Sequence, residues 1–342
     1  MLASQGYLTL SILSTEGFFP FFPPGVLVTV CEYEDYYDEN KKPAKRISTS
    51  AVFQVERERL SASDHFRTML RGSWRESTTE LITLHEDKIL AMEILFNGLH
   101  DTLGSIASTK VLMATVWYLI LACDKYEVEF REGPLKAWFI GWYKQEKINP
   151  DFERQVLYPC YEFDYAPGFQ EVTRYFAYHS KYHIMEHKPI DLFVLHLPQR
   201  VIQQLNAARG RLRNVLHNGL FDHITVFDHF RELERIKVWP LENTMKKKAS
   251  INDILTNLKQ FDSSRIRAPG TGTTSNGNQC TLNPGQGVFD GLCLDCMSVT
   301  KTLQEGRDPD HEYWQNCEKS IWDLYCRINH GEPTYITDIQ QL

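Results

Sequence analysis

The stretch from Ala51 to Tyr126 constrains the fold most, because strand-type and helix-type patterns follow each other there without a break. It begins with AVFQV, continues with the helical pattern ERERLSASDHFRTML and reaches a second β-type run, TELITL. Two amphipathic patterns follow, HEDKILAMEILFNGLHD and STKVLMATVWYLILACDKYEVE. Apolar residues recur in both at three- and four-residue spacing, which is typical of helices with one buried face. The order predicts a small sheet covered by helices.

Another strand is predicted just before this stretch. The β-branched run GVLVTV, from Gly25 to Val30, can pair with AVFQV as a hairpin. Between the two runs, CEYEDYYDENKKPAKRISTS is first acidic, then basic, and has no hydrophobic period. We expect a long hairpin loop or a disordered insert at residues 31–50. Residues 1–24, which end in GFFPFFPP, are expected to be a lead-in that packs on the first domain.

Single residues place the helix boundaries. Ser61 is expected to cap a helix that has Asp64 in its first turn and ends at Gly72. Pro134 fits the first turn of a later helix. The predicted buried face of that helix consists of Leu135, Trp138, Phe139 and Trp142. Residues 25–146 therefore read as strand, strand, helix, strand and three helices, which predicts the α+β class.

The same region resembles the BTB/POZ domain. From Phe53, FQVERERLSASDHFRTMLRGSWRES is similar to the family signature of a strand, a Leu, a Ser, an aromatic residue, a Met-Leu pair and an aromatic-x-Glu-Ser element. LITLHED and AMEILFNGLHD are similar to its next strand and helix, and the segment from Trp117 to Tyr126, which ends in CDKY, to the helix after that. The resemblance covers residues 25–146.

The resemblance implies function through protein–protein contact, without a catalytic step. BTB/POZ proteins form homodimers or hetero-oligomers, or act as adaptors that dock cullin scaffolds of ubiquitin ligases. The partner-binding residues expected here are Trp74, Glu76, Phe66 and Met69.

Two details bear on the type of partner. Trp74-Arg75-Glu76 is similar to the hydrophobic-x-Glu element of cullin-binding members, whereas the alternative is that Trp74 packs internally and Glu76 is solvated. Many members begin the first strand with Asp-Val, and that Asp supports the dimer. Pro24-Gly25-Val26 stands at this place here, which weakens the case for a standard dimer.

Residues 147–261 are predicted to form a mainly helical region. Phe169–Tyr178 and Gln199–Leu220 have helical patterns, and residues 228–261 have a weaker one that Pro240 interrupts. FDYAPGFQEVTRYFAYHS and LHLPQRVIQQLNAARGRLRNVLHNGLF resemble BTB proteins of filamentous fungi. Three arginines lie mostly off the apolar stripe of the longer helix and are expected to keep their charges in water, with a phosphate or RNA role as the alternative. They are Arg209, Arg211 and Arg213.

The end of the chain is predicted to be a flexible linker, residues 262–292, followed by a small helical tail, residues 293–342. The C-x-x-C in the tail has the spacing of half a zinc site, and a Cys and a His four residues apart on the helix predicted over Asp310–Asn329 can supply the other half. The predicted structural zinc ligands are Cys293, Cys296, Cys326 and His330, with Cys280 and His311 in reserve. The alternatives are buried free thiols or a redox pair.

A second metal hypothesis rests on His179, His183 and His187, which are four residues apart. They form a row only if one helix continues through all three, and Pro189 follows closely. If the helix ends near Tyr178, the row disperses.

Composition limits the function classes. A net charge of −7 and a pI near 6.0 argue against a nucleic-acid surface, and the basic run at Lys246–Lys248 reads as a solvated segment. The sequence has no P-loop, G-x-S-x-G, G-x-G-x-x-G or H-E-x-x-H motif, so an enzyme, such as a metal-dependent one, is the less favoured class. Without an evident signal peptide or membrane span, we expect an intracellular protein of the cytoplasm or nucleus, whose eight cysteines are reduced.

Overall fold

The computed structural model describes residues 10–11, 25–37, 41–72, 81–106, 111–146, 150–186, 189, 196–221, 227–240, 244, 249–262, 289, 291–297 and 327. The chain divides into two compact units. Unit 1 comprises Met1–Ile148, Glu162–Asp164 and Lys188–Leu195. Unit 2 comprises Asn149–Tyr161, Tyr165–His187 and His196–Leu342.

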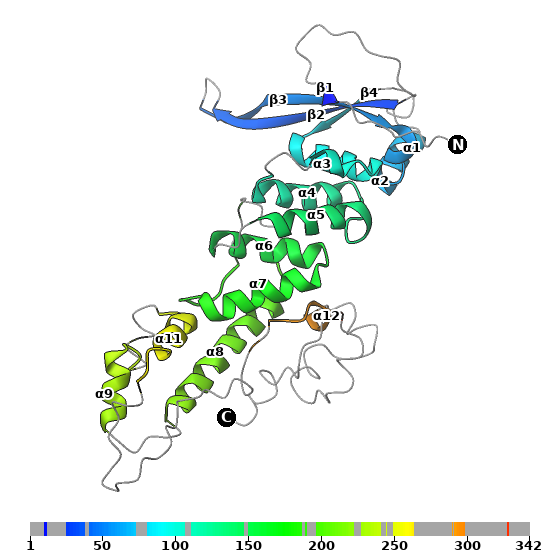
Figure 1. Cartoon of the computed structure of the whole chain (residues 1–342). Coiled ribbons are helices and arrows are strands. Elements are labelled where there is room, and N and C mark those ends of the chain that lie inside the picture. Colours follow the sequence, from blue (N-terminus) through cyan, green and yellow to red (C-terminus); the bar gives the residue numbers. More distant parts are fainter. Residues whose placement is uncertain are drawn as a thin grey trace. The chain divides into compact units, whose positions relative to one another are not determined.

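Unit 1 contains a mixed sheet with the order β1-β3-β2-β4 (Figure 1). Strands β2 (Gly25–Tyr37) and β3 (Pro43–Glu56) form the predicted antiparallel hairpin. Strand β4 (Leu81–His85) pairs parallel to β2, and the two-residue β1 (Leu10–Ser11) lies against β3. A parallel pair requires a crossover connection, which the helices between β3 and β4 supply.

Alternation of side chains explains why this sheet has one buried face. Apolar residues at every second position point into the core, and partly exposed or exposed residues occupy the positions between them. The buried side chains of the sheet include Val26, Val28, Val30, Phe53, Val55, Ile82 and Leu84. On the opposite face, Leu81 is 55% exposed.

The helices of unit 1 lie on the buried side of the sheet (Figure 1). Between β3 and β4 come α1 (Arg57–Leu60) and α2 (Asp64–Arg71). After β4 come α3 (Ile89–His100), the 3-10 helix η2 (Leu103–Ile106), α4 (Met113–Lys125) and α5 (Gly133–Gln145). The predicted α+β class is confirmed, with a small mixed sheet followed by a mainly helical region.

The N-cap of α2 differs from the prediction. Ser63, rather than Ser61, accepts a hydrogen bond from the backbone N–H of Phe66, at 3.1 Å, while Ser61 ends α1. Two short helices replace the single expected one because the chain turns at Ser61–Ser63. The predicted end at Gly72 is confirmed, as is Pro134 in the first turn of α5.

The expected loop or insert at residues 31–50 is wrong. Strands β2 and β3 continue as a two-stranded ribbon, in which Tyr33–Tyr37 pairs with Pro43–Ile47 beyond the last β4 pair, at Cys31. Arg46 Nε donates to Glu34 Oε1 across the strands at 2.6 Å. The acidic and basic halves of this segment therefore face each other in one hairpin.

Unit 2 is helical in the part that the structure describes. Its helices are α6 (Pro150–Glu162, whose last residue belongs to unit 1), α7 (Ala166–His179), α8 (Gln199–Phe221), α9 (Phe227–Arg235), α11 (Ile251–Leu258) and α12 (Leu294–Met297). These helices agree with the patterns predicted over Phe169–Tyr178 and Gln199–Leu220. Among the described helices, none has the length and apolar content to cross a membrane.

Candidate protein-interaction surface

Helix α2 carries two of the four expected partner-binding residues, Phe66 and Met69. The Phe66 side chain is fully buried and its ring stacks on Tyr126, with centroids 4.7 Å apart and planes at 13°. Phe66 is therefore a core residue, and it cannot meet a partner in the folded protein. Met69 is partly exposed. Trp74 and Glu76 lie outside the described residues.

Phe66 is held in the core by a polar network around α4. The buried Ser63 hydroxyl donates to the Tyr126 backbone carbonyl. The Tyr126 hydroxyl donates to Asp87 Oδ2 at 2.5 Å, and Lys125 Nζ lies 2.9 Å from both oxygens of that carboxylate. Burial and the Asp87 contact raise the pKa of Tyr126. The CDKY and HED segments therefore have a structural role, fixing α4 against the β4–α3 turn.

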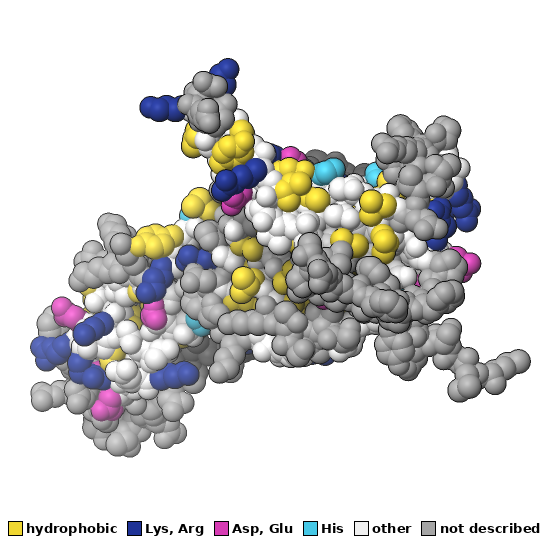
Figure 2. Space-filling view, turned by 90° about the horizontal axis from the view of Figure 1, so that it is seen from above, with side chains coloured by type: hydrophobic (Ala, Val, Ile, Leu, Met, Phe, Trp, Pro, Cys, Tyr) yellow, Lys and Arg dark blue, Asp and Glu magenta, His cyan; other side chains and the backbone are white. Residues whose placement is uncertain are grey.

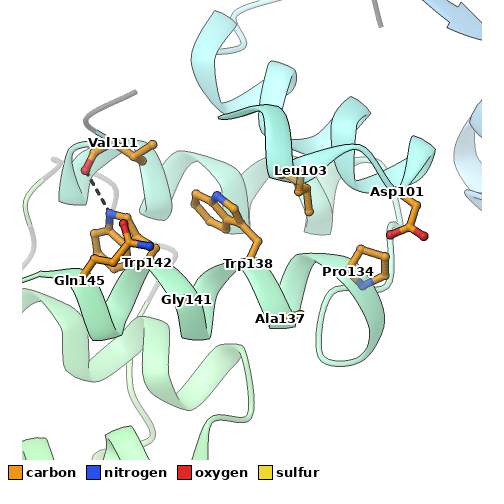
Figure 3. A pocket seen from close by; sticks show the side chains of 10 residues that line it. Asp101, Leu103, Val111, Pro134, Ala137, Trp138, Gly141, Trp142 and Gln145 are labelled. Carbon is orange, nitrogen blue, oxygen red and sulfur yellow. Dashed lines mark hydrogen bonds between the residues drawn. The ribbon is translucent and has the colours of Figure 1, made fainter. Parts of the chain in front are cut away.

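A hollow of unit 1 in the described residues lies between α5 and the end of α3 (Figure 3). This groove has a volume of about 350 Å³. Its lining is Asp101, Leu103, Gly104, Val111, Pro134, Ala137, Trp138, Gly141, Trp142 and Gln145. The sequence placed Trp138 on a buried face, but it is only partly buried and its indole faces the groove.

Two tryptophans shape the floor of the groove. Trp138 and Trp142 are one helical turn apart, with ring planes at 18° and centroids 6.5 Å apart. Trp142 Nε1 donates to the backbone carbonyl of Val111 at 3.2 Å, which fixes its indole (Figure 3). Gly141 lies between them and adds no side chain above the backbone. The groove can therefore take an apolar side chain of a partner against a preformed aromatic surface.

Polar residues stand at the two ends of the groove (Figure 3). Asp101 ends α3 in the left-handed conformation, with φ of 60°, and is exposed. Gln145, at the other end, is also exposed. An apolar floor with polar ends is the arrangement of small protein interfaces, in which the centre supplies affinity and the rim supplies orientation.

The ribbon is the second exposed feature of unit 1. Tyr37 is 76% exposed and Ile47 is 52% exposed. The Arg46 guanidinium lies 5.4 Å from the Tyr36 ring centroid, and Lys45 Nζ lies 2.7 Å from Glu86 Oε1. Figure 2 shows this projection with hydrophobic side chains beside Lys and Arg. Exposed aromatic residues on a strand pair suit contact with another protein chain.

The predicted zinc ligands are described only in part. Cys293 is buried, and Cys296 belongs to α12, but its side chain is outside the described residues, as are Cys326, His330, Cys280 and His311. Among the described residues, no three His, Cys, Asp or Glu side chains are grouped as metal ligands. The zinc site stays a prediction.

The segment that carries Cys293 is docked on α7. The Leu292 backbone N–H donates to Thr173 Oγ1 at 2.8 Å, and that of Phe289 donates to the Tyr178 hydroxyl at 3.0 Å. Gly291 has a φ of +106°, and a Cβ there would lie 2.1 Å from the Gln170 carbonyl oxygen. The close approach requires glycine.

The histidine row is not continuous. Helix α7 ends at His179, with Ser180 extended, so His183 is beyond the helix and exposed. His179 Nδ1 lies 3.1 Å from the Tyr175 carbonyl oxygen. His187 lies outside the described residues. The two described histidines therefore do not share a helical face.

Unit 2 also buries a carboxyl that sequence reasoning missed. Glu153 on α6 has no exposed surface, and its oxygens have no hydrogen-bond partner among the described groups. Burial, with Glu171 adding a like charge, raises the Glu153 pKa to about 8. Burial likewise raises the pKa of the nearby Cys160 thiol, which keeps it protonated and unreactive. Neither group presents a reactive atom to solvent.

Comparisons of the chain with protein-family models, with curated proteins and with solved structures gave no match.

Proposed function

We propose that the chain is a protein–protein interaction protein of the BTB/POZ type, which acts by self-association or as an adaptor or scaffold, without a catalytic step. The observation that carries the proposal is the groove on α5. Trp138 lines this groove and is partly exposed, so part of its aromatic surface is not buried in the core. Tryptophan, with tyrosine and arginine, is enriched among the side chains that dominate binding energy at interfaces.

The arrangement of unit 1 supports the BTB/POZ resemblance. A hairpin, two short helices, a parallel third strand and further helices follow each other in the order that the resemblance implies, and the helices lie on one face of the sheet. The signature residues have consistent roles, since the Ser of the signature caps α2 and the aromatic residue fills the core.

The test measures subunit number and partner binding together. Native mass spectrometry and sedimentation of the full chain at micromolar concentration should show an oligomer, or else the monomer should bind a purified cullin amino-terminal domain. Trp138→Ala should weaken whichever association is seen by tenfold or more, since hot-spot truncations cost about 2 kcal/mol or above. The same spectra report any bound zinc.

A matched control separates the groove from exposed apolar residues in general. Leu112 is 61% exposed and does not line the groove, so Leu112→Ser should leave the association unchanged. A strict monomer that binds no cullin domain would rule out both forms of the proposal. An association that Trp138→Ala leaves intact would remove the groove as its site.

A further inference from the structure

Helix α8 carries two arginines on one face in unit 2. Arg209 and Arg213 are four residues apart, a spacing that makes side chains neighbours on a helix. The sequence predicted that both would keep their charges in water. That prediction is wrong for Arg209, which is 4% exposed, while Arg213 is partly exposed.

The contacts of these arginines leave several donors unused. Arg209 Nη1 donates to the backbone carbonyl of Tyr182, in the segment that follows α7. Arg209 Nε and Nη2 and Arg213 Nε are buried and have no hydrogen-bond acceptor. Among the described residues, no acidic side chain forms an ion pair with either guanidinium.

The electrostatics of the pair is unfavourable as it stands. Burial lowers the pKa of Arg209 to about 10, with the charge of Arg213 as a further cause, and burial also lowers the pKa of Arg213. Both guanidinium groups still carry their protons at neutral pH. Buried charges are ordinarily paired, because an unpaired one is costly to remove from water.

The buried carboxylate of Glu232, also in unit 2, follows that rule. The Glu232 carboxylate is 2.5 and 2.8 Å from Arg235 nitrogens and accepts from the Asp262 backbone N–H at 3.0 Å. Glu153, which lacks a partner, can become neutral by binding a proton. An arginine has no such alternative, since it is not deprotonated in proteins. Arg209 therefore carries a buried charge without the counter-charge that such groups ordinarily have.

The unused donors indicate the shape of a matching anion. Nε and Nη2 of one guanidinium form a parallel pair of N–H groups that matches two oxygens of one oxyanion. In Arg209 this edge is buried and has no acceptor, while Nη1 donates to the Tyr182 carbonyl. Arg213, one turn further on and partly exposed, adds a second cation.

We propose that the Arg209–Arg213 face of α8 is a binding site for a phosphate-type dianion, held side-on by Arg209 and closed by Arg213. The source is either free phosphate or a phosphoryl group on a small molecule. Both present the same tetrahedral oxygens, so the experiment below includes one probe for each.

The test is thermal unfolding of the full chain in sodium phosphate and in sodium chloride at matched ionic strength. Above Kd, the Tm should rise by about 2–4 °C for each tenfold increase in phosphate. O-phospho-L-serine serves as the second probe in the same buffer. A larger Tm shift with phosphoserine would indicate a phosphoryl group, and a shift with inorganic phosphate alone would indicate the free ion.

Arg209→Met should abolish the phosphate shift and should raise the Tm in chloride, because an apolar side chain replaces an unpaired buried charge. Arg174→Met, at an exposed position on α7, is the control and should keep the full shift. If Arg209→Met does not fold, Arg213→Met, at the partly exposed position, is used instead and should also abolish the phosphate-dependent Tm shift. The proposal is overturned if wild type shows no anion-specific shift, if Arg209→Met or Arg213→Met keeps it, or if Arg209→Met lowers the Tm in chloride.

Discussion

Glu153 should make the stability of this protein fall as the pH rises through neutrality. Its carboxyl is fully buried without a hydrogen-bond partner among the described groups, and burial, with the Glu171 charge as a further cause, raises its pKa from 4.5 to about 8. Because the folded state holds this proton more tightly than the unfolded state, stability is fully present below about pH 4.5. It is lost as the pH rises toward about 8.

The magnitude follows from the two pKa values. Each tenfold change in an equilibrium constant is about 1.4 kcal/mol, so ionising Glu153 in the folded protein costs at most about 5 kcal/mol. Between pH 5 and pH 8 the expected loss is about 3–4 kcal/mol. That is a large share of the stability of an ordinary domain.

Glu153→Gln removes the ionisation and keeps the shape of the side chain. Urea unfolding followed by far-UV circular dichroism at pH 5, 6, 7 and 8 should show wild type and variant within about 1 kcal/mol at pH 5. At pH 8 the variant should be more stable by about 3–4 kcal/mol. Glu234→Gln, which removes an exposed carboxyl of the same unit, controls for the loss of one negative charge.

A difference between wild type and Glu153→Gln that stays constant from pH 5 to pH 8 would refute the reasoning. It would mean that Glu153 ionises in the folded state with no more difficulty than in the unfolded chain. A variant that is less stable than wild type at pH 8 would contradict the sign as well as the size.

Three further predictions test contacts elsewhere in the chain. Tyr126→Phe removes the hydroxyl that donates to Asp87 at 2.5 Å and should lower the free energy of unfolding by about 1.5–3 kcal/mol in urea titrations, so an unchanged midpoint would contradict the Asp87 network. Gly98→Ala would place a Cβ 2.5 Å from Leu135 Cδ2 and should cost about 1–3 kcal/mol by the same assay, whereas Gly104→Ala, with open space around its Cα, should not show this overpacking loss. Gly291→Ala should release the segment docked on α7, so that a thiol reagent reacts faster with the buried Cys293 in the folded protein. Gly210→Ala, at a position with open space, is the control. Equal reaction rates in the two variants would show that the close approach of Gly291 to Gln170 is not needed.

The regular elements could be predicted because their patterns are local. GVLVTV and LITL lie in strands, and the patterns with three- and four-residue spacing lie in α3, α4, α7 and α8, with ends that differ by several residues: α4, for example, begins at Met113. Each of these patterns records which side of one element faces a core, and that is a property of the element alone.

The failures concern relations between elements. The sequence of the ribbon predicts a loop because its two strands have no hydrophobic period. Pairing across the hairpin, as between Glu34 and Arg46, holds the strands together. Helical spacing places Trp138 on the buried face of α5, because spacing within one helix cannot show that the neighbouring η2 leaves a groove beside it. Arg209 and Glu153 look like ordinary helix-surface charges, and only the packing of other helices buries them.

The start of α2 is ambiguous in the sequence because two serines, Ser61 and Ser63, precede it. Ser61 and Ser63 are both good N-cap residues by type, and in the structure Ser63 caps α2 while Ser61 ends α1. For the groove, a tryptophan pair one turn apart with a glycine between them was visible in the sequence, but it gives no indication of exposure.

The parallel pairing of β4 with β2 has a consequence for how the chain reaches its native state. Leu27 pairs with Leu81, 54 positions later, whereas Tyr37 pairs with Pro43, six positions later. The hairpin can therefore close early and locally, but β4 must wait until the intervening chain has collapsed, since long loops lose entropy before their contacts form. During synthesis the β2 edge stays uncovered until the segment around residue 85 has left the ribosome, and in that interval it is open to pairing with other chains.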